Sequence, residues 1–128
     1  MIKNKNLKVY IYCLIVAFLF LLIATKSSPL YVCNDWVDSN IFFNIAKGIV
    51  HGEVPYRDLF EQKGPLLYFA YIIPYLISND TFLGVYFLEV LLFSLTLFAF
   101  YRTINLFCNV KASCLVIPIF SFFALNTR

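Results

Sequence analysis

The stretch that decides the fold runs from Asp35 to Tyr68 and has the sequence DWVDSNIFFNIAKGIVHGEVPYRDLFEQKGPLLY. It is a charged segment between strongly apolar ones, and most of the ionisable residues outside the termini lie in it. A chain this apolar has little reason to carry such a segment unless the segment works at a membrane surface. We therefore expect the functional site to lie here.

The composition around this segment is that of an integral membrane protein. Of the 128 residues, 62% are hydrophobic, 20% are aromatic and only 13% are charged, and the mean hydropathy is +0.82. A soluble domain has about 45–50% apolar and about 25% charged residues. The net charge of +3 is small and its lysines form no basic stripe, so nucleic acid is not an expected partner.

The four cysteines do not predict a bound metal or a disulfide. Cys13, Cys108 and Cys114 lie in or beside apolar runs, and Cys33 is the only one in the polar loop. None has the paired spacing of metal ligands. We expect a structural or incidental role for all four and no cofactor, and the sequence leaves dependence on a divalent metal open.

The first apolar run predicts a membrane span over 7–25. Lys3, Lys5 and Lys8 lie on its N-terminal side, and its length is close to the ~20 residues that a spanning helix needs. A signal peptide has the same pattern, but no small-residue cleavage site follows Ala24. We expect an uncleaved helix with a cytoplasmic N-terminus, because lysines favour the inner side of a membrane.

The external loop then covers residues 26–81 and contains a second apolar run at 65–77. This run is only a dozen residues or so long and contains Pro74. At ~1.5 Å per residue it is too short for a ~30 Å hydrocarbon core. We expect a helix in the outer interface, with its tyrosines at headgroup level.

Two further spans follow, over 82–101 and 112–126. The turn between them, 102–111, contains Arg102 and Lys111, which lie in the cytoplasm in this topology, as the charge rule requires. The predicted fold class is therefore an all-α integral membrane protein. It has three transmembrane helices and an external loop that contains amphipathic interfacial helices.

The first loop helix is expected over about 38–50. Its apolar residues recur at three- and four-residue steps, and polar residues line the opposite face. Asp35 is expected to cap this helix, which places Asp38 in the first turn, and the helix should end near His51. The helix dipole at that end favours an ionised Asp38.

Two interpretations of these charges remain open. Asp38 is either a general base toward a polar substrate or a solvated residue at a helix start. Arg57 and Lys63 are cations next to the interfacial helix and suit a phosphate. Alternatively, Asp58 and Glu61 neutralise both of them in a salt-bridged turn.

Two other ionisable residues are secondary candidates. His51 is the single histidine, and without a second His or Cys nearby it makes a weak metal ligand. Glu89 lies within the second span, ~10 Å from its outer end by helical rise. An intramembrane carboxylate is a functional candidate by default, and a buried hydrogen-bond partner is the alternative.

The segment WVDSNIFFNIAKGIVHGEVPYRDLFEQKGPLLYF resembles the first external loop of bacterial membrane glycosyltransferases of the GT-C class. It is similar to the glycosyltransferase family 39-like mannosyltransferases and aminoarabinose transferases. That group includes Gram-positive members described as teichoic acid glycosyltransferases. The resemblance covers about a quarter of the chain.

The resemblance implies transfer of a sugar from a polyprenyl-phosphate carrier to a cell-envelope glycan acceptor, on the external face of the bacterial plasma membrane. It implies that Asp38 is the general base, with Asp35 as the second choice. Lys63 lies in a Lys-Gly-Pro that resembles the family's Lys-Pro-Pro and would hold the carrier phosphate, with Arg57 as a weaker candidate. The family mechanism inverts the anomeric centre.

The chain departs from the family in length, because family members have many more spanning helices. We therefore expect an N-terminal piece of such an enzyme, inactive alone. The alternative is a small multi-pass membrane protein that contacts lipid or a partner without catalysis.

Overall fold

The computed structural model describes the backbone of residues 2–126 and the side chains of residues 6–125. These residues form five helices, and their only β pairing is a single bridge between Pro55 and Leu59. The all-helical fold class is therefore confirmed. The chain divides into two compact units. The loop unit is Lys26–Leu88, and the bundle unit comprises the chain before and after it.

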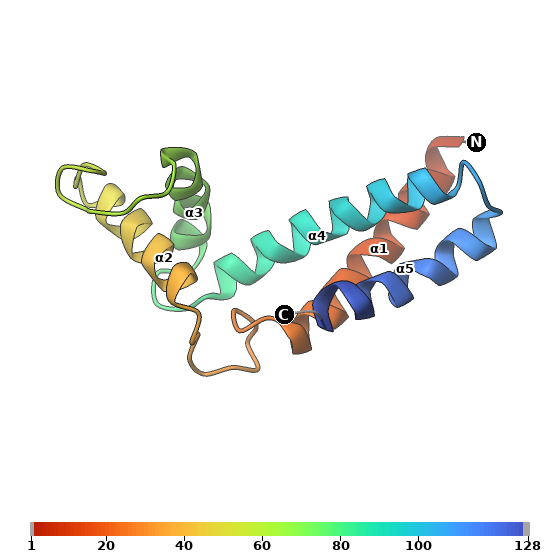
Figure 1. Ribbon diagram of the computed structural model, residues 1–128, viewed down its shortest axis with the longest axis horizontal. Coiled ribbons are helices and arrows are strands. Elements are labelled where there is room, and N and C mark those ends of the chain that lie inside the picture. Colours follow the sequence, from red (N-terminus) through yellow and green to blue (C-terminus); the bar gives the residue numbers. More distant parts are fainter. Residues whose placement is uncertain (1, 127–128) are drawn as a thin grey trace. The chain divides into compact units, whose positions relative to one another are not determined.

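Three helices build the bundle unit: α1 (Ile2–Ala24), α4 (Leu83–Ile104, within this unit from Glu89) and α5 (Val110–Asn126). They are helices at the positions of the apolar runs predicted over 7–25, 82–101 and 112–126, with ends that differ by a few residues. Figure 1 shows α1 and α5 side by side, and the Tyr12 hydroxyl donates to the Cys114 carbonyl oxygen at 3.2 Å. Phe100 of α4 stacks on Phe120 of α5 with ring centroids 4.1 Å apart.

Two helices in the described part of the chain are long and apolar enough to cross a membrane. They are Asn6–Ala24, with 19 residues, and Leu83–Ile104, with 22. At ~1.5 Å per residue these lengths are about 28 and 33 Å, close to the ~30 Å hydrocarbon core. The 17 residues of α5 give about 26 Å, so α5 is apolar but shorter.

The bundle unit buries small polar residues between its helices and leaves large apolar ones outside. Ser94, Ser113 and Ser121 are completely buried, and each hydroxyl donates to a carbonyl oxygen three or four residues earlier in the chain. By contrast, Leu19 is 55% exposed and Leu92 is 55% exposed. Small residues at the contacts and apolar ones outside are typical of helices that pack within lipid.

Two helices build the loop unit, α2 (Val37–Val50) and α3 (Pro65–Ile77), and they pack against each other (Figure 1). Both were expected, at about 38–50 and at 65–77. Phe42 of α2 contacts Tyr68 and Tyr71 of α3, and Phe43 contacts Tyr75. The apolar stripe predicted for α2 is therefore the face that α3 covers.

The start of α3 follows from its sequence. Gly64 is the N-terminal capping residue in an extended conformation, and Pro65 occupies the first helical position, where a missing N–H costs nothing. Pro74 near the other end contacts the first turn of α4: a Cβ added to Gly84 would lie only 2.0 Å from the Pro74 carbonyl oxygen. Glycine is what allows this close approach.

Candidate functional site

Both acidic candidates lie at the N-terminal end of α2 with free carboxylates. Asp38 occupies the first turn and Asp35 precedes the helix, and both side chains are exposed. Among the described residues, neither carboxylate makes a hydrogen bond or an ion pair. A carboxylate that is held on a helix and unused by the protein is available to accept a proton from a ligand.

The expectation that Asp35 caps α2 is wrong. The capping residue is Trp36, and no side chain accepts a cap hydrogen bond there. Instead, the Asn40 amide donates to the carbonyl oxygens of Asn34 (2.7 Å) and Trp36 (3.0 Å), and the Asn34 side-chain oxygen accepts from the Trp36 N–H. Two asparagines therefore bond the backbone at this end, Asn34 as an acceptor and Asn40 as a donor, and Asp35 takes no part.

Lys63 is held by its backbone, whereas its side chain stays exposed. Its carbonyl oxygen accepts hydrogen bonds from the hydroxyls of Tyr56 and Tyr68, the latter at 2.8 Å, and we call this arrangement the tyrosine clamp. Tyr68 is 1% exposed, and burial raises the pKa of its phenol, which keeps the hydroxyl a donor. Tyr56 adopts a φ of 66°, a conformation that non-glycine residues rarely hold. The tyrosine clamp holds the Lys63 backbone, from which the exposed side chain extends.

Arg57, the second phosphate candidate, is already paired. Its guanidinium donates to both carboxylate oxygens of Asp58, at 2.9 and 2.7 Å. The hydrogen bonds from Arg57 and from the Val54 N–H lower the pKa of Asp58 to about 2, and those to Asp58 raise the pKa of Arg57. The alternative of a salt-bridged turn therefore holds for Arg57, but not for Lys63. Glu61 accepts from the Gln62 N–H instead of pairing with a cation.

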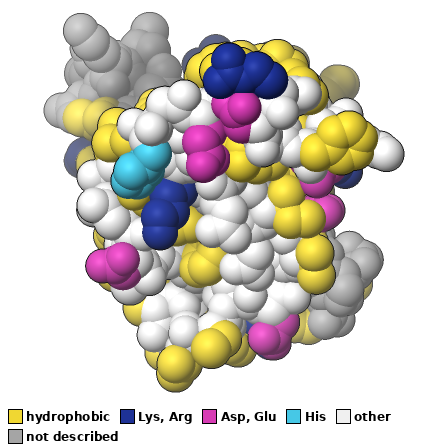
Figure 2. Space-filling view, turned by 90° about the vertical axis from the view of Figure 1, so that its left-hand side faces the viewer, with side chains coloured by type: hydrophobic (Ala, Val, Ile, Leu, Met, Phe, Trp, Pro, Cys, Tyr) yellow, Lys and Arg dark blue, Asp and Glu magenta, His cyan; other side chains and the backbone are white. Residues whose placement is uncertain are grey.

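His51 is the C-terminal capping residue of α2. Its Nδ1 lies 2.7 Å from the Lys47 carbonyl oxygen, and because a carbonyl only accepts, Nδ1 carries the proton. Lys47, His51 and Glu53 line one shallow pocket, and Figure 2 shows Lys and Arg side chains beside Asp and Glu side chains on this face of the loop unit. No group of three His, Cys, Asp or Glu side chains in the described residues has the geometry of a metal site.

Glu89 belongs to the bundle unit and is hydrogen-bonded there. The Thr25 hydroxyl, directly after α1, donates to a Glu89 carboxylate oxygen at 2.6 Å. Glu89 therefore lies at the level where α1 ends. Of the two interpretations that the sequence left open, this contact corresponds to the hydrogen-bond partner.

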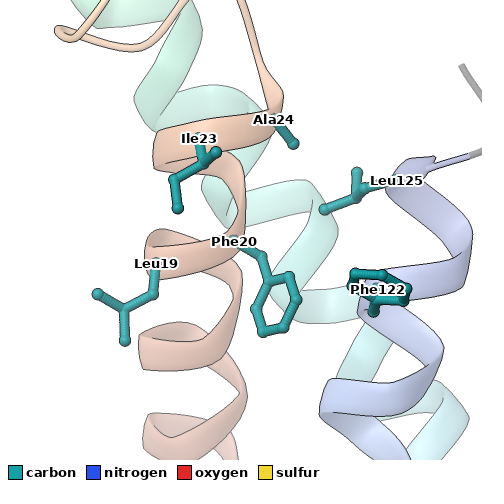
Figure 3. A pocket seen from close by; sticks show the side chains of 6 residues that line it. All are labelled: Leu19, Phe20, Ile23, Ala24, Phe122 and Leu125. Atoms are coloured by element: carbon teal, nitrogen blue, oxygen red, sulfur yellow. The ribbon is translucent and has the colours of Figure 1, made fainter.

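Two larger cavities complete the picture. In the bundle unit, an apolar groove of about 460 Å³ separates α1 from α5, and Figure 3 shows Phe20, Phe122 and Leu125 directed into it. In the loop unit, a cavity of about 520 Å³ with both polar and apolar walls is lined by Lys26 and Asp80 among others. Sequence reasoning did not select these two residues, because they are isolated charges without a motif around them.

The loop unit thus contains Asp38 in the first turn of α2, Asp35 just before α2 and Lys63 just before α3, whereas Glu89 belongs to the other unit. No hydrogen bond or ion pair joins Asp38 to Lys63 within the described residues. Any joint action of the two would therefore be through a ligand. Comparison with known proteins adds no assignment: no protein-family model, curated protein or solved structure matches this chain.

Proposed function

We propose that the chain belongs to a membrane glycosyltransferase that takes a sugar from a polyprenyl-phosphate carrier and passes it to a cell-envelope acceptor. In this proposal α1, α4 and α5 cross the membrane in the order in–out–in–out, and the loop unit lies on the external side. Arg102 and Lys111 are then cytoplasmic, which agrees with the preference of basic residues for that side.

The free Asp38 carboxylate is the observation that carries the proposal. Three of the acidic side chains at issue have partners: Asp58 binds Arg57, Glu61 accepts from a backbone N–H, and Glu89 accepts from Thr25. Asp38 has none among the described residues and is fixed in the first turn of a packed helix. In the proposed reaction it removes the proton of the acceptor hydroxyl as that oxygen attacks the anomeric carbon.

Lys63 supplies the matching cation. Its ammonium has no acidic partner in the described residues, and the tyrosine clamp limits how far the residue can move. As the bond from the sugar to the carrier phosphate breaks, negative charge grows on that phosphate. A fixed cation stabilises this charge more in the transition state than in the ground state.

The outer face of α3 agrees with a position in the membrane interface. Leu66 is 82% exposed, and Ile73 and Leu76 are 61% and 63% exposed, because α2 covers only the opposite side. An apolar face that is exposed among the described residues, on a helix of about 20 Å, fits the boundary between headgroups and acyl chains. The same face is what favours the alternative, a lipid-contacting protein without catalysis.

The test compares two neighbouring carboxylates. Membranes that contain a full-length version of the enzyme are supplied with radiolabelled polyprenyl-phosphate hexoses, and transfer of label to envelope glycan is measured for the wild type, Asp38→Asn and Asp35→Asn. A general base contributes about 10²–10⁴-fold, so Asp38→Asn should lower transfer by that factor, with Asp35→Asn close to wild type.

A second measurement separates binding from chemistry. Lys63→Gln should weaken retention of undecaprenyl phosphate, whereas Asp38→Asn should leave it unchanged. Full transfer by Asp38→Asn would refute this residue as the base. Carrier binding without sugar transfer by the wild type would favour the non-catalytic, lipid-contacting alternative.

A further inference from the structure

The cavity of the loop unit between Lys26 and Asp80 is lined by residues that no part of the proposed reaction uses. Its volume of about 520 Å³ is within the range of small-molecule sites in proteins, about 300–1,000 Å³. Its walls come from the segment that follows α1, from Asn40 of α2, and from the segment that leads into α4. Neither Asp38 nor Lys63 lines it.

Part of the cavity lining is buried and hydrogen-bonded. Ser27 and Ser28 are each 2% exposed although both are polar, and Asn34 is also buried. The Asn34 amide donates to the Ser27 hydroxyl at 3.2 Å, and the Asn34 carbonyl oxygen accepts from Asn40, which lines the cavity as well. A buried and connected polar network holds its geometry before a ligand arrives.

The rim carries one charge of each sign, and the two charges do not neutralise each other. Lys26 and Asp80 both line the cavity, and both are exposed. They form no ion pair with each other; the ion pair found among the described residues joins Arg57 to Asp58. The Lys26 ammonium lies 4.5 Å from the centre of the Tyr31 ring, which orients it by a cation–π contact. The cavity therefore offers a cation and an anion to one ligand.

The position of these residues in the chain indicates the source of such a ligand. Lys26 comes two residues after the apolar segment Asn6–Ala24, and Leu83, another lining residue, begins the apolar helix Leu83–Ile104. Where both helices cross a membrane, residues next to their ends lie among lipid headgroups. Val32 and Phe82 add apolar surface to the same cavity.

We infer that this cavity binds a phosphate ester that bears a primary ammonium group, such as the headgroup of phosphatidylethanolamine. The phosphate accepts hydrogen bonds from Lys26, and the ammonium donates to Asp80. A purely anionic headgroup has no ammonium group to donate a hydrogen bond to Asp80. A quaternary ammonium carries the charge but has no N–H to donate. The cavity should therefore distinguish the primary amine from both.

The test measures which lipid the chain retains. The full chain is purified in detergent with equal amounts of phosphatidylethanolamine, phosphatidylglycerol and phosphatidylcholine, and bound lipid is identified by native mass spectrometry. We expect phosphatidylethanolamine to exceed each of the other two by about tenfold, the effect of one charge-assisted hydrogen bond. Competition with the soluble headgroup glycerophosphoethanolamine then distinguishes the two possible ligands. Displacement of the bound lipid would indicate a soluble ligand, and retention of the lipid would indicate a lipid from the bilayer.

Variants tie the preference to the two charges. Lys26→Gln and Asp80→Asn should each abolish the preference, whereas Lys47→Gln and Glu61→Gln, which remove the same charges outside the cavity, should not. The exchange Lys26→Asp with Asp80→Lys should restore part of it, and that result would separate a lost contact from a misfolded loop. Equal retention of the three lipids, or a preference that survives Asp80→Asn, would overturn the inference.

Discussion

Replacing Gly84 by alanine should loosen the junction between α3 and α4, on which the geometry of the loop unit depends. The added Cβ would lie 2.0 Å from the Pro74 carbonyl oxygen, 2.7 Å from its carbon and 2.8 Å from the Pro74 Cα. Ordinary contact begins at 3.4 Å. The helices would have to separate by the difference, 3.4 − 2.0, or about 1.4 Å, because backbone atoms cannot rotate away as a side chain does.

Two opposing effects set the size of the loss. Overpacking costs about 1–3 kcal/mol of stability. Because the added Cβ would clash with three backbone atoms of Pro74, we expect a cost at the upper end of this range. Alanine gains about 1 kcal/mol over glycine within a helix. The net prediction is a free energy of unfolding lower by about 2 kcal/mol.

The matched control is Gly64→Ala. An added Cβ at Gly64 would meet nothing within 4 Å, and the backbone there has an ordinary extended conformation, φ −70°. Its effect should stay within about 0.5 kcal/mol, since a weaker N-terminal cap offsets a less flexible unfolded chain. Pulse proteolysis in urea measures both variants in detergent micelles. Equal stabilities of Gly84→Ala and Gly64→Ala would refute the close packing at Pro74.

Three further predictions concern the loop unit. Arg57→Gln should raise the pKa of Asp58 from about 2 toward its usual 3.8, as seen by a carboxyl NMR titration. Because the folded pKa is the lower one, the contribution of this pair to stability is complete above pH 3.8 and disappears as the pH falls toward 2; an unchanged pKa in Arg57→Gln would contradict the pairing. Asn40→Ala should speed amide exchange in the first turn of α2 and cost about 1 kcal/mol, whereas Asp35→Asn should do neither. Tyr68→Phe, which removes one hydroxyl of the tyrosine clamp, should also cost about 1 kcal/mol in urea unfolding, and an unchanged midpoint would show that the clamp does not hold the turn.

The helices were predictable because periodicity and length determine them. The expected interfacial helix 65–77 has the bounds of α3, since Gly64-Pro65 sets its start and too few apolar residues follow for a span. The stripe of α2 was predictable for the same reason: its apolar residues recur at helical steps, and one face had to be covered.

Side-chain partners were predictable only where a single nearby side chain could make the hydrogen bond or ion pair. Asp35 was a reasonable cap by residue type, but the Asn34 side-chain oxygen, not Asp35, accepts a backbone N–H at this end of the helix, that of Trp36. The pairing of Arg57 with Asp58 was one of two open alternatives, and nothing in the sequence decides between a phosphate and a neighbouring carboxylate. The cavity with Lys26 and Asp80 needs the fold, because 54 positions separate the two charges along the chain.

The proposed orientation can be tested with the chain's own cysteines. Cys33 belongs to the loop unit and Cys108 to the turn between α4 and α5, and both are exposed, so a thiol reagent in water can reach either one. Single-cysteine variants remove Cys13 and Cys114 from the measurement.

The most direct measurement treats intact cells with a membrane-impermeant maleimide, before and after permeabilisation. The proposal predicts that Cys33 reacts in intact cells, whereas Cys108 reacts only once the membrane is opened. Labelling of Cys108 but not Cys33 in intact cells would place the Asp38 loop in the cytoplasm and contradict a site on the external face. Equal labelling of both without permeabilisation would contradict the crossing of the membrane by α4.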